Sequence, residues 1–403
     1  MTHIDIAAQP REACELINQE LILATARKHG AGDDRERCMI TEAFFWSLVL
    51  SVGDKVHHGF YPAMASVFRK LYGNDITKGG IKKQMKRRDW HWFKDIYEEL
   101  LQECLPKLDA MEYDFLGRFT DVRAVDSTVI EIVKKLGGKF RATTKGLAAL
   151  KVHTLFSVKH FVALKVGVTD QCSADINFSF LSREKGVLYV FDLGYWCYGL
   201  LTDIMKRKSF FVSRLKEGAD VTIEKFLCRG YSAFDGHKKK LMELISSGNL
   251  GGELFDAIVQ LGDMKERLRL VGLKHDDEWY FYVTNLTDFT PQVIYETYRL
   301  RWQIELFFKD LKSGVSLRDI TTRTENAIML EIYAVLIFHL LTRMLMSEAV
   351  AKKPVRLSVR KSLAMVKRRL ADVVLPMLLG RVRRFRAELR SLLASLLAQC
   401  EPG

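Results

Sequence analysis

The stretch GVLYVFDLGYW, residues 186–196, indicates a mixed α/β fold. Its apolar run from Val187 to Phe191 is typical of a strand that is buried on both faces of a sheet. Asp192 ends the run and Leu193-Gly194 turns the chain, and the following YGLLTDIMKRK is expected to form a helix. Functional groups collect where strands of such sheets end, so Asp192 is the first candidate site residue.

Further β-type segments lie on either side of this stretch. DVRAVDSTVIEIV (121–133) is β-branched and predicts a strand with Asp126 near its middle or end. LKVHTLFSV (150–158) and FVALKVGVT (161–169) predict a hairpin, and SFFVSRLK (209–216) predicts another buried strand. Residues 220–285, which include RLRLVGL and EWYFYVTNL, are interpreted as a mostly β insertion.

The two ends of the chain are predicted to be helical. Near the amino end, a short helix, the Gly79-Gly80 turn and a basic helix resemble a helix-turn-helix. We therefore expect a helical DNA-binding domain at 1–118, a catalytic core at 119–218 and 287–330, a β-rich insertion domain at 219–286 and a helical basic region at 331–403.

Basic side chains are concentrated in two places on a chain with a formal net charge of +13. Residues 351–390 hold thirteen Lys or Arg and two acidic residues, a net charge of +11. The second cluster lies among Trp90, Trp92 and Phe93 and consists of Lys78, Lys82, Lys83, Lys86, Arg87 and Arg88. A single charged run is ordinarily a solvated face, but two of them on a basic chain favour a polyanionic partner, with nucleic acid the first candidate.

The bulk composition is that of an ordinary globular protein, with 48% apolar and 28% charged residues. The apolar run IYAVLIFHLL (332–341) is short and contains His339, which suits a buried helix better than a membrane span. No signal peptide is expected. The seven cysteines show no CxxC spacing, so we interpret them as reduced thiols of a cytosolic protein. His153, His160 and His339 are expected to serve packing.

The segment YRLRWQIELFFKDLK, residues 298–312, contains no Pro or Gly and predicts a two-sided helix. At about 100° per residue, four polar groups fall on one face roughly 60° wide: Tyr298, Arg301, Glu305 and Lys312. The opposite face is apolar and carries Leu300, Ile304, Phe307 and Leu311. The alternative interpretation is a solvated face on which Arg301 and Glu305 form an ordinary i,i+4 pair.

Three carboxylates stand at the edges of apolar elements: Asp126, Asp192 and Glu305. Brought together, they would repel each other unless a cation held them. Magnesium or manganese, which prefer oxygen ligands, would suit, and a pair of such ions supports phosphoryl transfer. The alternative for each aspartate taken alone is a turn or a helix cap.

In combination, these features resemble a known family. The pattern Tyr298-x2-Arg301-x3-Glu305-x6-Lys312 matches the YREK signature of bacterial insertion-sequence transposases of the DDE class, the insertion-sequence-four type. VDST at Asp126, DLGY at Asp192, FVSRLK at 211–216 and TNL at 284–286 follow in that family's order. The resemblance covers roughly residues 121–313. Leu193 departs from it, because a polar or basic residue is common there.

The resemblance implies an RNase H-like core in which Asp126, Asp192 and Glu305 bind two Mg²⁺ or Mn²⁺ ions. It further implies cut-and-paste transposition, acting on terminal inverted repeats and target DNA as a homodimer in the bacterial cytoplasm, with no membrane. DNA contacts are expected from Tyr298 near a displaced base, from Arg301 and Lys312 on phosphates, and from Trp302, Lys82, Lys83, Lys86, Arg87 and Arg88. A non-catalytic DNA-binding regulator and an RNase H-like nuclease remain the alternatives.

Overall fold

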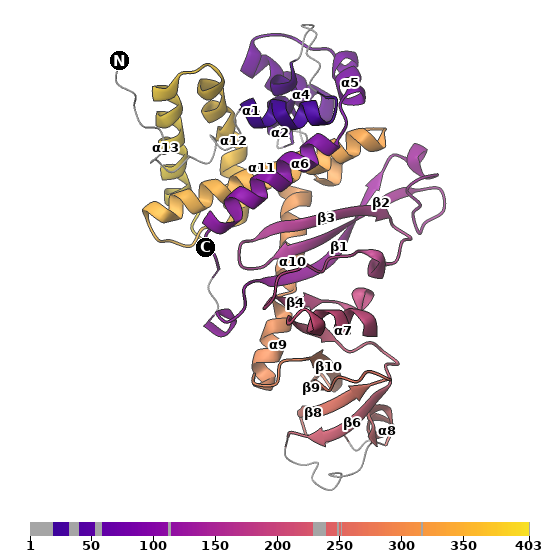
Figure 1. The fold of residues 1–403 in the computed structure, drawn as a ribbon. Coiled ribbons are helices and arrows are strands. Elements are labelled where there is room, and N and C mark those ends of the chain that lie inside the picture. Colours follow the sequence, from indigo (N-terminus) through magenta and orange to yellow (C-terminus); the bar gives the residue numbers. More distant parts are fainter. Residues whose placement is uncertain are drawn as a thin grey trace. The chain divides into compact units, whose positions relative to one another are not determined.

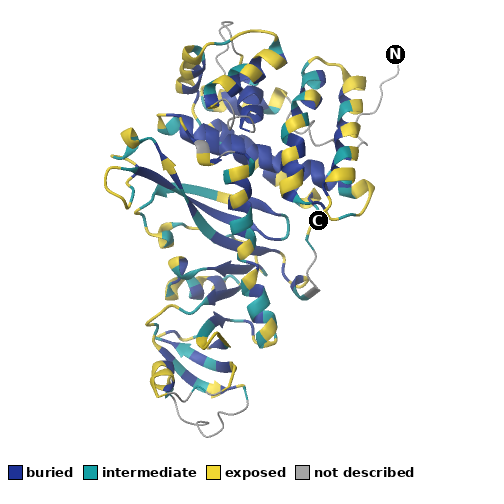
Figure 2. Ribbon diagram, turned by 180° about the vertical axis from the view of Figure 1, so that it is seen from behind, coloured by how far each residue is buried: buried dark blue, intermediate teal, exposed yellow. Residues whose placement is uncertain are grey.

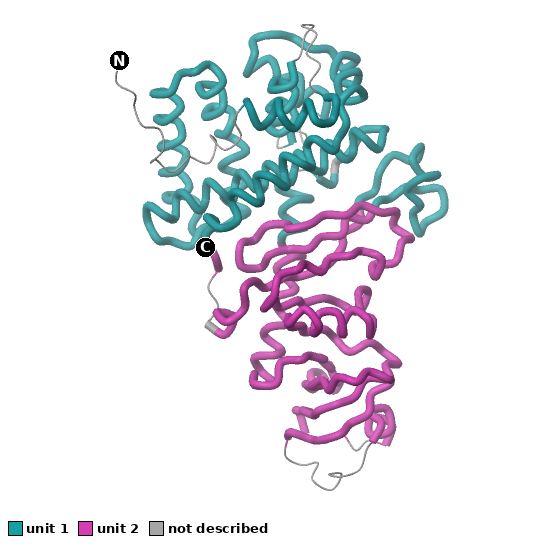
Figure 3. Tube along the Cα trace, viewed as in Figure 1, with its two compact units in different colours: residues 1–109, 130–150, 307–403 teal, residues 110–129, 151–306 magenta. Residues whose placement is uncertain are grey.

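The computed structural model describes residues 19–31, 40–52, 59–111, 114–228, 239–247, 250, 252–315 and 317–402. The chain divides into two compact units, which Figure 3 shows in different colours. Unit 1 comprises residues 1–109, 130–150 and 307–403, and unit 2 comprises residues 110–129 and 151–306.

Unit 2 is built on a mixed sheet, so the predicted α/β class is confirmed (Figure 1). Among the described residues the sheet has ten strands in the order β3-β2-β1-β4-β5-β10-β9-β8-β6-β7. The strands are β1 (Val122–Ile132), β2 (Ala148–Ser157), β3 (Val162–Asp170), β4 (Leu188–Phe191), β5 (Phe210–Arg214), β6 (Val221–Phe226), β7 (Lys239–Lys240), β8 (Leu254–Leu261), β9 (Leu268–His275) and β10 (Glu278–Thr284). The last three residues of β1 and the first three of β2 are assigned to unit 1.

Strand β4 lies in the interior of this sheet and pairs in parallel with β1 and β5. All four of its residues are fully buried, as the apolar run predicts. After a 3₁₀ turn (Leu193–Tyr195), helix α7 (Tyr198–Lys206) buries Leu201 and Ile204 in the core that also holds Phe191. The strand, the tight turn and the helix around Asp192 are therefore confirmed.

The predicted β insertion continues the same sheet. Strand β10 pairs antiparallel with β5, so that Thr284 lies opposite Val212, and β9, β8 and β6 follow outward. The residues of 219–286 that are described are thus joined to the central strands by backbone hydrogen bonds and do not form a separate sheet.

The described residues of unit 1 are mostly helical, and the unit also includes the end of β1 and the start of β2. Its helices include α1 (Gln19–Lys28), α2 (Thr41–Ser51), α4 (Phe60–Tyr72), α5 (Lys78–Arg87), α6 (His91–Cys104), α11 (Glu325–Lys352), α12 (Val359–Leu378) and α13 (Val382–Gln399). Helix α11 is the core of the unit and contacts α2, α6, α12 and α13. The predicted domain boundary at 330/331 falls inside this continuous helix.

Helix α11 is long and apolar enough to cross a membrane by length and composition alone. However, its most apolar window is entirely buried within the protein, which Figure 2 shows as a dark-blue helix. His339, in this helix, is 2% exposed, and burial, aided by the charge of Arg343, lowers its pKa to about 3. The expectation of a buried helix with a packing histidine is confirmed.

The predicted Gly-Gly turn of a helix-turn-helix is wrong. Gly79 and Gly80 lie in the first turn of α5, which begins at Lys78. The hydroxyl of Thr77 accepts a hydrogen bond of 3.1 Å from the Gly80 N–H and caps the helix. The first N–H groups of any helix lack partners within the helix, and a capping Thr side chain supplies one. Such a cap allows α5 to contain two glycines in its first turn, although glycine in the interior of a helix would destabilise it.

Candidate active site

Asp126 and Asp192 are brought side by side by the register of two parallel strands. Val125 on β1 lies opposite Phe191 on β4; Asp126 is the next residue of β1, and Asp192 directly follows the last residue of β4. Neighbouring strands are about 4.8 Å apart, and in-register residues point to the same face. The two carboxylates, 66 positions apart in sequence, therefore start from adjacent points on one face of the sheet.

Both aspartates are anchored in the same way. One oxygen of Asp126 accepts a 2.7 Å hydrogen bond from the Ser127 N–H, and one oxygen of Asp192 accepts a 2.8 Å bond from the Leu193 N–H. Asp192 thus caps the turn that follows it, as the alternative interpretation of single aspartates proposed, whereas Asp126 lies within β1. The second oxygen of Asp126 is left for another partner.

The predicted continuous helix over 298–312 is wrong, because it is interrupted at Leu300 and Arg301. Helix α9 (Pro291–Arg299) ends there and α10 (Trp302–Lys309) begins after a tighter turn. Leu300, Arg301, Gln303 and Ile304 donate backbone hydrogen bonds three residues back rather than four. Side chains three apart eclipse each other in such a 3₁₀ turn. The guanidinium of Arg301 accordingly lies 6.0 Å from the centre of the Tyr298 ring.

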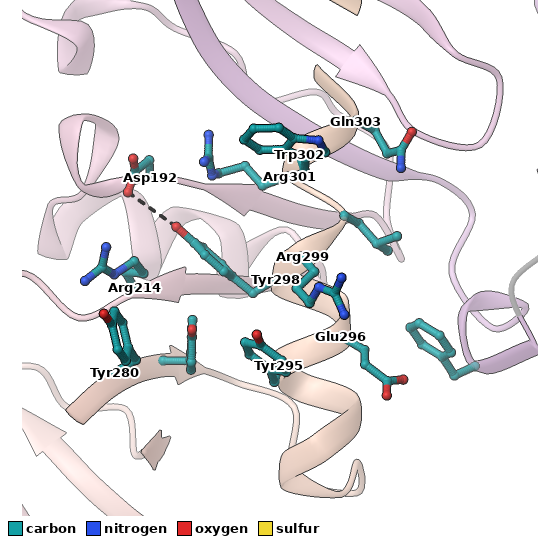
Figure 4. A pocket seen from close by; sticks show the side chains of 13 residues that line it. Asp192, Arg214, Tyr280, Tyr295, Glu296, Tyr298, Arg299, Arg301, Trp302 and Gln303 are labelled. Atoms are coloured by element: carbon teal, nitrogen blue, oxygen red, sulfur yellow. Dashed lines mark hydrogen bonds between the residues drawn. The ribbon is translucent and has the colours of Figure 1, made fainter. Parts of the chain in front are cut away.

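Arg301 connects the carboxylates that come from distant parts of unit 2. Its Nη1 donates to Asp126 Oδ2 at 2.8 Å and its Nη2 donates to Glu305 Oε1 at 2.6 Å. The i,i+4 pair expected on a solvated face therefore exists, but the Arg301 side chain is only 17% exposed and holds a second carboxylate. The Tyr298 hydroxyl donates to Asp192 at 3.4 Å, as the dashed line in Figure 4 shows.

The electrostatics of the cluster are those of crowded acids. Burial raises the pKa of Asp126 from its ordinary value of 3.8 to about 6. The Ser127 N–H and the Arg301 charge oppose this shift, while the charges of Glu305 and Asp192 add to it. The negative charges of the three carboxylates thus repel one another, and a cation placed among them would be bound strongly.

The acidic residues fit a divalent ion by their chemistry. They offer only oxygen ligands, which Mg²⁺ and Mn²⁺ prefer, and the Arg301 guanidinium already takes the place of a cation between Asp126 and Glu305. In the described part of the chain, no three acidic, His or Cys side chains are grouped closely enough to hold a metal ion as they stand. Binding of an ion would therefore require Arg301 to release at least one carboxylate.

The pKa of Asp126 leads to a prediction for stability in buffer free of divalent ions. Because the folded pKa of about 6 lies above the ordinary 3.8, protonation of Asp126 stabilises the fold at about pH 4. This stabilisation is lost as the pH rises through 6. Asp126→Asn, which is always neutral and keeps an oxygen for Arg301, is expected to raise the free energy of unfolding near pH 8 by about 1–3 kcal/mol and to change it little near pH 4.

Denaturant unfolding at both pH values measures this difference. Asp203→Asn is the matched control, because Asp203 is an exposed carboxylate on α7 paired only loosely with Lys206. An equal effect of Asp126→Asn at the two pH values would contradict the shifted pKa.

A hollow of about 710 Å³ opens beside Asp192, and Figure 4 shows the side chains that line it. Three of the predicted DNA-contact residues, Tyr298, Arg301 and Trp302, line it, and Trp302 is 56% exposed. The sequence interpretation missed its other aromatic and basic members, which are Phe115, Arg214, Tyr280, Tyr282, Tyr295 and Arg299. The alternation of Tyr280 and Tyr282 on β10 was a usable signal, because residues two apart on a strand share a face.

The remaining predicted DNA contacts lie in unit 1. Lys312 is half-buried in a π-helical turn (Asp310–Gly314), and burial lowers the pKa of its amine. Lys82, Lys83, Lys86 and Arg87 are exposed on α5. Arg88 is not: it is 5% exposed, donates to Gln84 and packs on the Phe44 ring at 4.8 Å. Arg88 is therefore a core residue and is removed from the set of DNA contacts.

Comparison with known proteins agrees with this geometry. The family model described as "Transposase DDE domain" matches residues 117–341, more than half of the chain. A Sinorhizobium fredii protein named "Putative transposase y4zB" is 27% identical over 232 residues, which is 55% of this chain and 60% of the relative.

Two further relatives extend the match. The "Putative transposase for insertion sequence element IS4SA" of Synechocystis is 23% identical over 70% of this chain and 76% of the relative. The "Transposase for insertion sequence element IS231F" of Bacillus thuringiensis is 22% identical over 68% of this chain and 66% of the relative. On the strength of the matched domain, which contains Asp126, Asp192 and Glu305, this chain belongs to the family of transposases with a DDE domain.

Proposed function

We propose that this protein cleaves DNA at the ends of its own insertion sequence and joins the freed ends to target DNA. The observation that carries the proposal is the convergence of Asp126 and Glu305 on Arg301, next to Asp192. The strand order β3-β2-β1-β4-β5, with β1, β4 and β5 parallel, supports an RNase H-like core. The protein would act in the bacterial cytoplasm, where its DNA substrate lies.

The chemistry assigned to the site is phosphoryl transfer without a covalent protein intermediate. Two Mg²⁺ or Mn²⁺ ions would activate the attacking oxygen and stabilise the leaving one. Asp126, Asp192 and Glu305 would hold these ions. Arg301, freed from a carboxylate, and Lys312 would grip the phosphates beside the scissile bond, since a guanidinium binds phosphate bidentately and an ammonium supplies a point charge.

The tyrosine-lined hollow beside Asp192 supports contact with a nucleotide displaced from the duplex. Tyr298 packs against Tyr282 with ring centres 4.9 Å apart, and Arg214 lies over the Tyr280 ring at 5.3 Å. Aromatic rings stack on any base, and basic groups at the rim attract the backbone. Trp302, largely exposed at the edge of the hollow, suits the same role.

Helix α5 supports a second DNA-binding surface in unit 1, formed by Lys78, Lys82, Lys83, Lys86 and Arg87. These side chains are exposed, whereas Ile81, Gln84 and Met85 are buried, so the helix presents one basic face. The face borders a hollow of about 730 Å³ that also includes Tyr61 and Arg323. Lys78 and Lys82 lie 5.4 and 5.6 Å from the centre of the Tyr61 ring.

Removing two of these lysines is expected to weaken binding to all DNA sequences alike. For Lys82→Ala with Lys86→Ala, the slope of log affinity against log salt concentration should fall by about two, one per lost phosphate contact. Fluorescence anisotropy over a salt series measures it. Lys94→Ala, which removes a partly exposed lysine paired with Glu98 on α6, is the control. An unchanged slope would show that this face is merely solvated.

The deciding experiment incubates purified protein with duplex DNA that carries the element's own termini, in Mg²⁺ or Mn²⁺. A transposase produces 3′-hydroxyl ends at the element boundary and then joined products. A DNA-binding regulator would bind the termini without cutting, and a nuclease on the same core would cut without joining. Two ends must meet for joining, so we expect a homodimer in the active complex.

A further inference from the structure

We propose that Asp175 is a positioning residue that ties together the two chain segments bearing Asp126 and Asp192. The inference rests on the proposed function, because it concerns how that site is held. Asp175 begins a short 3₁₀ turn (Asp175–Asn177) after β3 and belongs to none of the motifs that identify the family. Its carboxylate meets both segments at once.

The first tether runs to the segment of Asp126. Ser127 follows Asp126 directly on β1, and its hydroxyl donates to Asp175 Oδ1 at 3.1 Å. The Ser127 N–H is the group that anchors Asp126 Oδ1 at 2.7 Å. One residue thus joins the two carboxylates, with its backbone on Asp126 and its side chain on Asp175.

The second tether is a close packing contact with the turn that Asp192 caps, not a hydrogen bond. Gly194 lies in the 3₁₀ turn that Asp192 caps, and a Cβ atom placed on Gly194 would lie 2.8 Å from Asp175 Oδ2. A Cβ atom at this distance would force the Asp175 carboxylate or the turn to shift, so glycine permits the close approach. The two oxygens of Asp175 therefore face the two segments separately.

Asp175 is itself held by a largely buried cation. Lys151 on β2 is 13% exposed, and its Nζ lies 3.2 Å from Asp175 Oδ1 while it donates to the Ser173 carbonyl at 2.8 Å. A charged pair this sheltered from water is screened by salt less than a surface pair is. The position of the carboxylate is thus fixed from the sheet side.

His153, two residues along β2, lies on the same face but is not the counter-charge. Burial lowers its pKa, and its Nε2 lies 2.9 Å from the Thr169 hydroxyl, which donates its proton to the Asp170 carbonyl. Its Nδ1 lies 3.2 Å from the Tyr195 hydroxyl and 3.5 Å from Asp175 Oδ1. The neutral imidazole packs beside these groups, and Lys151 supplies the positive charge that pairs with Asp175.

Groups that orient metal ligands without touching the metal typically change metal affinity or activity by about 10- to 100-fold when replaced. For Asp175→Asn, which keeps an oxygen for Ser127 and nearly the same volume, we expect the half-saturating Mn²⁺ concentration to rise by about tenfold. The electron paramagnetic resonance signal of free Mn²⁺ measures this without any turnover. Cleavage should fall at limiting Mn²⁺ and recover largely at saturating Mn²⁺, while the affinity for DNA ends stays unchanged.

Asp203→Asn is the matched control, because Asp203 is an exposed carboxylate on α7 whose ion pair is with Lys206, outside this network. Ser127→Ala and Gly194→Ala each disturb one tether and should weaken Mn²⁺ binding in the same direction. They decide the question if Asp175→Asn does not fold. Wild-type Mn²⁺ affinity in Asp175→Asn, or in both tether variants, would overturn the positioning role.

These outcomes are separable from failure of the proposed function. If the wild-type chain neither binds Mn²⁺ nor cuts its termini, the proposed function fails. If the wild type does both and Asp175→Asn matches it, only the role of Asp175 fails.

Discussion

Asp192→Asn is expected to abolish metal-dependent cleavage of the element's termini while leaving binding to those termini intact. Asparagine has the shape of aspartate and its oxygen still accepts from the Leu193 N–H, so the turn after β4 should persist. It lacks the negative charge that holds a divalent ion. A group that stabilises transition-state charge is typically worth about 10²–10³ in rate, and a metal ligand should lie at the upper end or beyond.

Single-turnover cleavage of labelled termini, beside a gel-shift titration of the same DNA, measures the two properties. Asp126→Asn and Glu305→Gln should behave alike, because all three carboxylates are assigned to one site. Asp203→Asn, on the exposed face of α7, should cut at the wild-type rate. Cleavage by Asp192→Asn near the wild-type rate would remove Asp192 from the site and leave the fold unaffected.

The positions of Asp126 and Asp192 were predictable because strand physics is local. An apolar run that ends in an aspartate and a tight turn predicts both the strand and the exposed carboxylate. A β-branched segment with an internal Asp predicts the second. That Val125 and Phe191 are in register, which makes the aspartates neighbours, is a property of the assembled sheet and was not readable from either segment.

The break between α9 and α10 was not predictable from periodicity. No Pro or Gly lies between Tyr298 and Lys312, and each residue favours a continuous helix. The 3₁₀ turn instead accompanies tertiary contacts, in which Arg301 reaches Asp126 on a strand 175 residues away. Helix propensities of tenths of a kcal/mol per residue are readily outweighed by such contacts.

Reasoning from sequence patterns erred in opposite directions at Arg88 and Asp175: it assigned a DNA contact to Arg88 and gave no role to Asp175. Arg88 ends a run of basic residues, but it directly follows α5 and is buried, four residues after the buried Gln84 and three after the buried Met85. Asp175 lies in a connection with no periodic pattern at all. Its partners come from β1, β2 and the turn after β4, so only the folded chain identifies it.

Arg301→Met is expected to strengthen Mn²⁺ binding while it lowers the cleavage rate. The guanidinium occupies oxygens of Asp126 and Glu305 that the proposed ion would need, and its positive charge would repel that ion. Relief of about 1.4 kcal/mol of this competition would lower the half-saturating Mn²⁺ concentration about tenfold. Cleavage should nevertheless fall by about 10²-fold or more, because the phosphate loses its bidentate partner.

The opposite signs of the two effects are what make this variant informative. A residue that served only to hold the fold would weaken both ion binding and cleavage when replaced, and loss of a metal ligand would do the same. Arg301→Lys should be intermediate in ion binding, since an ammonium keeps the charge but does not bridge two carboxylates with a planar fork. Arg299→Met, an exposed neighbour packed over Tyr295, should leave Mn²⁺ affinity unchanged. Unchanged or weaker Mn²⁺ binding in Arg301→Met would mean that the guanidinium does not compete with the ion, and that the cluster opens for metal by another route.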